Sequence, residues 1–172
     1  MSVPYKGITL DRTLRLYGNG KLPLSILKQV HCGGTMYGPA AWWFNVMWDD
    51  AKKAGITLKA TGRGYRPYGS QEAMFLDRYS RTPTLRKPVV TRKWKGHTWW
   101  LKRGKSPSAT PGFSNHGWGL AVDLEVPATT FAWLVHNAPR YGFYLQGPKY
   151  LPTGKPNPEY EAWHWQFCNL QP

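Results

Sequence analysis

Acidic side chains are scarce in this sequence, and between Asp77 and Asp123 there are none, although Lys and Arg recur throughout that stretch. The chain carries a formal net charge of +14, which predicts an anionic partner: nucleic acid, an acidic polymer or a membrane surface. Charge alone does not choose among these. The sequence also lacks an apolar run of about 18 residues, so we expect no transmembrane segment.

The N-terminus, MSVPYKGITLDRTLRLYG, lacks the apolar centre of a secretory signal, so we expect synthesis in a cytoplasm without a signal peptide. Cysteine is rare too. Cys32 and Cys168 are the only ones, and in an unexported chain two distant cysteines are expected to be free thiols rather than a bridge. A hydrophobic content of 41% argues against disorder, and 172 residues suffice for one domain with its own core.

The hydrophobic pattern predicts a single α+β domain over 1–172, with a small antiparallel sheet and packed helices. The apolar spacing predicts three helices, at about 39–54, 69–80 and 128–138. Strands are expected at 56–61 (ITLKAT), 120–126 (LAVDLEV) and in the closing stretches YGFYLQ and WHWQF. Two segments look irregular: a loop-rich opening segment, 1–37, and a basic excursion, 81–110, predicted as a long loop with a hairpin around Gly96.

The stretch SNHGWGLAVD raises the question of a metal site, because it sets His116 seven residues before Asp123. Residues seven apart face opposite sides of an extended strand. Gly117 and Gly119 allow a bend that brings the two side chains together. Asp123 lies on the polar face of its expected strand beside the small Ala121, which leaves room for an ion.

A third ligand is available in EYEAWHW, where Glu161 precedes His164 by three residues. Two histidines and one aspartate can hold a catalytic metal, and a free glutamate can take a proton from water. Spacing alone leaves plainer readings open. His116 and Asp123 could be a buried hydrogen-bonded pair, and Glu161 and His164 a surface pair.

A resemblance favours the metal reading. SNHGWGLAVD resembles the Ser-x-His-x-x-Gly-x-Ala-x-Asp motif of the zinc D-Ala-D-Ala carboxypeptidase family, which includes VanY- and VanX-type peptidases and phage L-Ala-D-Glu endolysins. EAWH is similar to the family's Glu-x-x-His motif and GYRPYGSQ to its Gly-Tyr-Arg-x-Tyr-x-x-Gln segment. WLVHNAPRYGF resembles the segment between the metal motifs, so the likeness covers about residues 20–168. It implies a Hedgehog/DD-peptidase-like α+β fold.

The resemblance also implies roles for single residues. The zinc ligands would be His116, Asp123 and His164, with Glu161 as catalytic base and Arg66 stabilising the oxyanion. Ser114 and Gln71 stand at motif positions and are tentative substrate-binding residues. Trp118 is the tryptophan we expect to touch substrate, whereas Trp163 and Trp165 are expected to pack the core and the site walls. The role of Glu125 stays open.

Two other classes of function compete with this reading. Lys and Arg interleaved with Trp94, Trp99 and Trp100 are typical of a nucleic-acid surface, although the same charge suits an anionic cell wall. His31 beside Cys32 would also suit a Cys-His hydrolase, but no base or orienting residue follows at a recognisable motif. His97 and His136 are expected to be exposed. We therefore expect no stable nucleic-acid partner.

The sequence thus predicts a zinc peptidase that acts on bacterial peptidoglycan as a monomer. The segment 81–110 holds nine Lys or Arg residues. At the site rim these would favour a long acidic substrate, so we expect an endolysin-type L-Ala-D-Glu endopeptidase. The alternative is a D-Ala-D-Ala carboxypeptidase. A phage-type lysin would reach the wall after release from the cytoplasm, and the chain could also be the catalytic part of a larger lysin.

Overall fold

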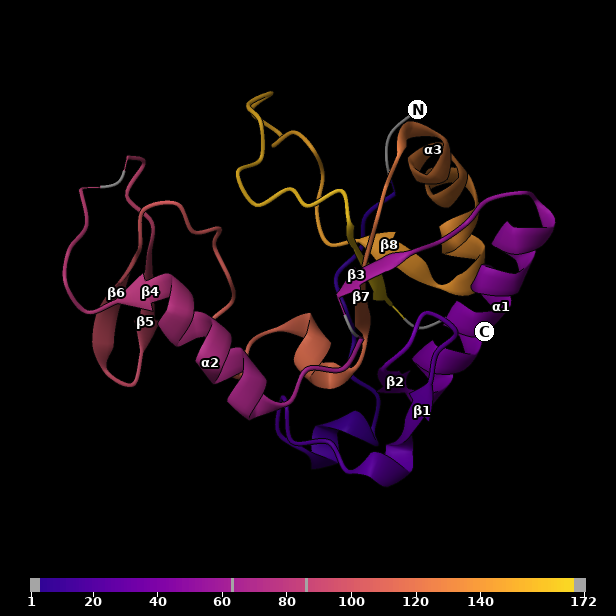
Figure 1. Ribbon diagram of the computed structural model, residues 1–172, viewed down its shortest axis with the longest axis horizontal. Helices are drawn as coiled ribbons and strands as arrows, with labels where there is room; N and C mark the ends of the chain where they lie inside the picture. The colour runs from indigo at the N-terminus through magenta and orange to yellow at the C-terminus, as the bar shows by residue number, and fades with distance from the viewer. Residues whose placement is uncertain (1–3, 63, 86, 169–172) are drawn as a thin grey trace.

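Two hydrophobic clusters organise the computed structural model, which describes residues 4–62, 64–85 and 87–168. The smaller cluster consists of Phe75, Tyr79, Trp94 and Leu101 and holds together what we call the small lobe, residues 68–110. The other described residues form the large lobe around the larger cluster. Helix α2 (Tyr68–Arg78) leads from one lobe into the other (Figure 1).

The large lobe is built on a four-stranded sheet in which every neighbouring pair is antiparallel, as predicted. Its order is β3 (Ala60–Gly62), β7 (Ala121–Leu124), β9 (His164–Phe167) and β8 (Phe143–Leu145). The strand predicted at 56–61 is wrong in extent. Leu58 is buried and Ile56 packs against the core, so the alternation is real, but strand pairing begins only at Ala60.

Helices α1 (Gly38–Lys53) and α3 (Ala128–Asn137) contribute to the same core as the sheet and confirm two predicted helices. Pro39 lies in the first turn of α1, where its missing N–H costs no hydrogen bond. Gly55 follows the helix with a φ of 75°, a backbone angle that favours glycine. Four short 3-10 helices complete the lobe: η1 (Leu14–Leu16), η2 (Leu24–Ile26), η3 (Asn115–Trp118) and η4 (Ala138–Tyr141).

The opening segment 1–37 is irregular in its described part, apart from η1, η2 and one antiparallel pair of strands. These strands are β1 (Leu27–Gln29) and β2 (Thr35–Tyr37), and they lie beside α1 (Figure 1). This segment also contacts the loops around the candidate site. Tyr68 donates a backbone hydrogen bond to Gly20, and Gly20 donates one to Gly117.

The prediction for 81–110 holds for most of the segment, since its described residues outside 91–94 and 97–101 lie in turns and irregular structure, but the hairpin strands also join a third strand. Strands β4 (Tyr79–Ser80), β6 (His97–Leu101) and β5 (Thr91–Trp94) form a sheet in that order. The predicted hairpin is confirmed. Lys95 and Gly96 both have positive φ, 47° and 76°, which is the two-residue type I′ turn that matches strand twist.

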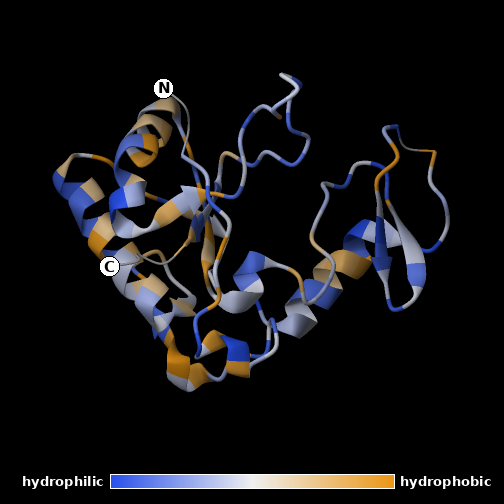
Figure 2. Ribbon diagram, turned by 180° about the vertical axis from the view of Figure 1, so that it is seen from behind, coloured by the Kyte–Doolittle hydropathy of each residue, from blue (hydrophilic) through white to orange (hydrophobic). Residues whose placement is uncertain are grey.

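Helix α2 ends at Arg78 rather than at residue 80, because Tyr79 is extended and pairs with Leu101. The ring of Tyr79 stacks on Phe75 at a centroid distance of 4.5 Å, which ties the helix to the sheet. The strands of the small lobe are largely hydrophilic outside this cluster, whereas hydrophobic residues recur along the helices and central strands of the large lobe (Figure 2). The described helices are all too short or too polar to cross a membrane.

Candidate metal centre

Two of the predicted ligands are brought together by the register of the sheet. Asp123 in β7 is directly opposite His164 in β9, and side chains opposite each other in an antiparallel pair lie on the same face. Asp123 Oδ1 is 3.1 Å from His164 Nδ1. Gly62 in β3 lies on the other side of Asp123, and a Cβ there would stand 2.8 Å from Asp123 Oδ2. The sheet therefore fixes the carboxylate between an imidazole and a glycine.

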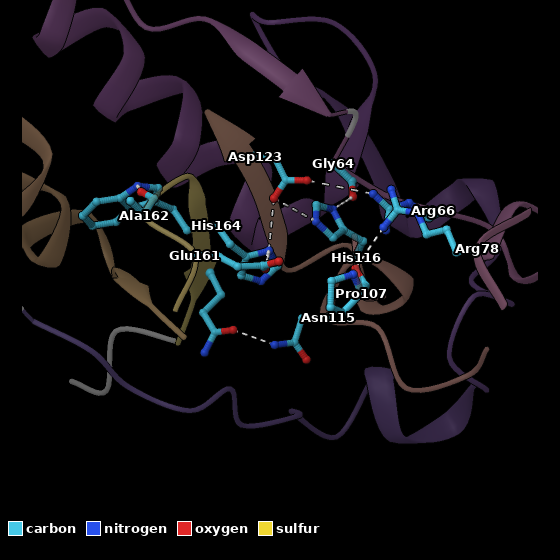
Figure 3. A network of polar contacts seen from close by, with 12 residues as sticks. Gly64, Arg66, Arg78, Pro107, Asn115, His116, Asp123, Glu161, Ala162 and His164 are labelled. Atoms are coloured by element: carbon cyan, nitrogen blue, oxygen red, sulfur yellow. Dashed lines mark hydrogen bonds and ion pairs between the residues drawn. The ribbon is translucent and has the colours of Figure 1, made fainter. Parts of the chain in front are cut away.

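The third ligand, His116, comes from the 3-10 helix η3 that precedes β7. The chain reverses after this helix at Gly119, whose φ of 64° favours glycine, and His116 Nε2 then lies 3.3 Å from Asp123 Oδ1. The predicted bend is therefore present. The ligand atoms of His116, Asp123 and His164 all lie within 4.8 Å of one another (Figure 3).

The protonation of His116 shows that this cluster fits a cation. His116 Nδ1 lies 2.9 Å from the carbonyl oxygen of Gly64, which can only accept a hydrogen bond, so Nδ1 carries the proton. In the neutral ring Nε2 is then a bare lone pair that faces the Asp123 carboxylate. Two acceptors in contact are satisfied by a cation between them, and imidazole nitrogen with carboxylate oxygen is a donor set that suits zinc.

Burial and charge act on the pKa values of these groups. Burial lowers the pKa of His116, which favours the neutral ring. Burial by itself raises the pKa of Asp123, but the interactions of its carboxylate with the His116 and His164 rings outweigh burial and hold that pKa well below its usual range. The centre therefore presents an ionised carboxylate and at least one neutral imidazole, the forms in which both bind metal.

Glu161 and Arg66 flank the ligands. The His164 amide donates to the carbonyl of Glu161 at 3.2 Å, so a turn brings the Glu161 carboxylate to 4.0 Å from His164 Nδ1. Burial raises the pKa of Glu161, and the nearby His164 partly offsets this. Arg66 Nη2 lies 4.0 Å from Asp123 Oδ2. The Arg66 amide donates to the His116 carbonyl at 3.0 Å, which ties the two loops together.

These side chains line a cleft of about 1060 Å³ to which both lobes contribute. The large lobe supplies the three candidate metal ligands and Glu161. It also supplies Trp163, which is 45% exposed. The small lobe supplies the end of α2 and the stretches 89–92 and 106–110. The predicted position of the basic excursion at the rim is therefore confirmed for these two stretches.

The tentative substrate residues lie in different surroundings. Ser114 lines the cleft next to His116. Gln71 and Trp118 are absent from the described cleft lining, which favours structural roles for both. The Gln71 amide nitrogen donates to Asn19 and to the Arg66 carbonyl, and its oxygen accepts from the Gly112 amide. Trp118 packs against the larger core, so its predicted contact with substrate gains no support.

The buried Asn19, in the opening segment, supports the loop that carries His116. Its side-chain nitrogen donates to the Ser114 carbonyl at 2.8 Å, and its oxygen accepts from Gln71. Gly117 passes so close that a Cβ there would overlap Asn19 Oδ1. Sequence reasoning missed Asn19, because its partners lie 52 and 95 residues away in the chain.

Sequence reasoning also missed Arg78, which lines the cleft from the small lobe. A signal was available in the helical spacing. Gln71, Phe75 and Arg78 recur at intervals of four and three residues, so Arg78 follows two buried residues on one face of α2.

The other candidates stand apart from the centre. The ring of His31 pairs with Asp49 at 3.3 Å, and burial raises the pKa of the Cys32 thiol, which opposes the reactive thiolate of a Cys-His hydrolase. Both cysteines are free.

The remaining histidines and flanking residues lie as follows. His97 and His136 are exposed, and Trp165 is fully buried in the core. The exposed Glu125 pairs with Lys59 at 3.9 Å.

Comparisons with known proteins agree with this geometry. Residues 35–170 match the family model described as VanY, D-alanyl-D-alanine carboxypeptidase. The putative carboxypeptidase YodJ of Bacillus subtilis (strain 168) is 31% identical over 133 residues, which are 70% of this chain and 42% of that protein. A D-alanyl-D-alanine carboxypeptidase of Enterococcus faecalis (strain ATCC 700802 / V583) is 26% identical over 130 residues, 71% of this chain and 44% of that protein. The chain thus spans less than half the length of these curated relatives.

Solved structures share the fold. VanYB in complex with D-alanine-D-alanine has a TM-score of 0.55 at 22% identity, covering 83% of this chain and 77% of that one. A VanY D,D-pentapeptidase in complex with Zn(II) has 0.52 at 21%, covering 86% and 83%. The LdcB LD-carboxypeptidase has 0.57 at 26%, covering 87% and 71%. With the family match over most of its length and three motifs gathered at one centre, the chain belongs to the VanY D-alanyl-D-alanine carboxypeptidase family.

Proposed function

We propose that this protein is a zinc-dependent carboxypeptidase that removes a C-terminal D-alanine from the stem peptide of peptidoglycan. The observation that carries the proposal is the convergence of His116, Asp123 and His164 within 4.8 Å in a cleft that also holds Glu161. The family match supports the type of bond, as do relatives described as carboxypeptidases.

Zinc is the metal that the centre fits best. The ion would be held by His116 Nε2, His164 Nδ1 and the carboxylate of Asp123. A related VanY structure contains Zn(II). When bound, zinc supplies a Lewis acid toward a peptide carbonyl and a water. Three is also the number of protein ligands that is usual in catalytic zinc sites.

The chain's own residues supply the proton transfers and part of the charge stabilisation. Glu161 takes a proton from the attacking water and passes it to the leaving amine, and its raised pKa brings it nearer to neutral pH for both steps. Arg66 faces the negative charge that develops on the carbonyl oxygen, a type of interaction that contributes about 2.7–4 kcal/mol per donor. The half-buried position of Arg66 strengthens this interaction.

The carboxypeptidase alternative is supported better than the endopeptidase that we first expected. That expectation depended on nine basic residues of the segment 81–110 at the cleft rim. Among those that the structure describes, only Arg92 lines the cleft, and it pairs with Glu159 at 3.5 Å. The described rim is therefore not strongly basic, and the comparisons favour removal of a terminal residue.

Digestion of purified peptidoglycan and of a soluble stem pentapeptide, followed by mass spectrometry, tests the proposal. We expect loss of one terminal D-alanine and release of free D-alanine. New N-terminal D-Glu without free D-alanine would instead identify an L-Ala-D-Glu endopeptidase and overturn the proposal. A stem tetrapeptide assayed in parallel separates D,D- from L,D-specificity, because it no longer ends in D-Ala-D-Ala.

Metal dependence is tested on the untagged protein. Elemental analysis should find about one zinc per chain, and the activity should be lost on chelation and restored by zinc. Action on the wall after release from the cytoplasm, a monomeric state and the lack of a stable nucleic-acid partner stay predictions.

A further inference from the structure

Three of the arginines that the structure describes line the cleft, and they differ in their partners. Arg66 faces Asp123 at 4.0 Å, and Arg92 faces Glu159 at 3.5 Å. Arg78 forms no ion pair with any carboxylate in the described part of the chain. Toward the residues that the structure describes, its guanidinium donates a hydrogen bond to a backbone carbonyl. A cation in a cleft without a carboxylate partner has its charge available for an anionic ligand.

Arg78 is held in place at both ends. It is the last residue of α2, and its own carbonyl accepts a hydrogen bond from the Lys102 amide at 2.8 Å. At the other end, Arg78 Nη1 donates to the Pro107 carbonyl at 3.0 Å (Figure 3). Both partners belong to the small lobe. The guanidinium is thus oriented before a ligand arrives, which reduces the entropy lost on binding.

The charges around Arg78 favour an anion beside the catalytic groups. Arg66 and Arg78 line the same cleft, so their positively charged guanidinium groups repel each other (Figure 3). Glu161 lines the same cleft from the large lobe. A bound carboxylate would relieve the repulsion between the arginines, and arginine binds carboxylates through paired hydrogen bonds.

The substrate of a carboxypeptidase ends one residue after the scissile bond. An extended chain advances about 3.5 Å per residue. If the scissile carbonyl lies between Glu161 and Arg66, a substrate that ends one residue later presents its terminal carboxylate one such step away. Arg78 is the cleft arginine that has no carboxylate of its own among the described residues, and it comes from the opposite lobe.

We propose that Arg78 binds the C-terminal carboxylate of the peptide substrate and so makes the protein select a free carboxyl end. This assignment rests on the proposed carboxypeptidase function and adds a specificity-determining residue to it. Arg66 stabilises charge on the reacting carbonyl oxygen, and Arg78 binds the terminal carboxylate of the peptide.

The test compares an N-acetylated stem peptide that ends in D-Ala-D-Ala as the free acid with the same peptide as a C-terminal amide. Binding is measured by calorimetry on zinc-loaded protein with Glu161→Ala, which prevents turnover. We expect Arg78→Gln in this background to weaken binding of the acid roughly 10- to 100-fold and to leave the amide unchanged. Arg103→Gln is the matched control, since Arg103 is exposed in the same lobe and is outside the cleft lining.

The assignment would be overturned if Arg78→Gln weakened binding of the acid and the amide equally, or weakened neither. It would also be overturned if the protein that retains Arg78 bound the two peptides equally well. Release of D-alanine is measured separately, on protein that retains Glu161. If D-alanine is released but Arg78→Gln does not reduce the preference for the acid over the amide, only this inference is contradicted. If Arg78→Gln does reduce that preference but the protein releases no D-alanine, the proposed function is contradicted and the assignment of Arg78 as a carboxylate-binding residue is kept.

Discussion

Glu161 and His164 are only three residues apart, yet substitutions at the two positions should have different consequences. Glu161→Ala should keep the zinc and lower turnover by at least roughly 10²- to 10⁴-fold, because it removes the proton acceptor and no ligand. His164→Ala should lose both metal and activity, because it removes a ligand atom from the cluster. Elemental analysis beside a D-alanine release assay measures both. Near-normal activity of Glu161→Ala would contradict its assignment as base.

Gly62 should control the position of Asp123. A Cβ at Gly62 would stand 2.8 Å from Asp123 Oδ2, so Gly62→Ala should push the carboxylate aside and weaken zinc affinity roughly 10- to 100-fold. Gly69→Ala is the control, since nothing lies within 4 Å of a Cβ there. Competition with a zinc-binding dye measures the affinity. Unchanged zinc affinity of Gly62→Ala would show that the strand shifts without moving the ligand.

Among the elements, the loop before η3 and the helix itself depend on Asn19. Asn19→Ala leaves the buried Ser114 carbonyl without this donor, so the unfolding free energy should fall by about 1–3 kcal/mol, and zinc affinity should fall with it. Asn45 also makes two hydrogen bonds, but exposed ones, so Asn45→Ala should change stability less and zinc affinity not at all. Urea unfolding and zinc titration measure the two effects. A purely local role is indicated if zinc affinity survives in Asn19→Ala.

For the whole molecule, stability should fall at alkaline pH because of Tyr37, whose hydroxyl donates to Asp11 at 2.7 Å. Burial, followed by this hydrogen bond, raises the pKa of Tyr37 to about 12 from its usual value of 10.0. The folded state therefore holds this proton over a range where the unfolded chain releases it. The stabilisation is complete below pH 10 and is lost as pH rises through about 12.

Urea unfolding between pH 9 and pH 12 measures this contribution, which should be on the order of 2–3 kcal/mol. Tyr37→Phe should show a correspondingly weaker pH dependence than the parent protein. Tyr5→Phe is the control, since Tyr5 is exposed and should leave the slope unchanged. Parallel pH profiles for the parent and Tyr37→Phe would contradict the assignment.

The molecule as a whole differs most from expectation in its small lobe. Residues 81–110 read as a loop because they are basic and rich in turn residues, yet Trp94 and Leu101 complete a second core with Phe75 and Tyr79 from α2. No local pattern announces such a core, since two of its members lie in a segment that reads as a helix. The same packing ends α2 at Arg78 and directs that side chain into the cleft.

The sequence by itself determined the features that short segments carry. Helical spacing and terminal Pro and Gly residues located α1 and α3 to within one or two residues, and Lys95-Gly96 located the hairpin turn, because these signals act between residues close in the chain. The motifs identified the family and brought His116, Asp123, Glu161 and His164 into view as one set.

Only the tertiary structure decided how distant segments meet. The register that sets Asp123 opposite His164, the support of His116 by Asn19 and the entry of Arg78 into the cleft all join residues that are far apart in sequence. Such contacts depend on how whole elements pack, and a one-residue change of register would turn a strand side chain to the other face. The tertiary structure likewise put Trp163 rather than Trp118 in the cleft wall, because the side of a segment that meets the core is decided by its neighbours in space.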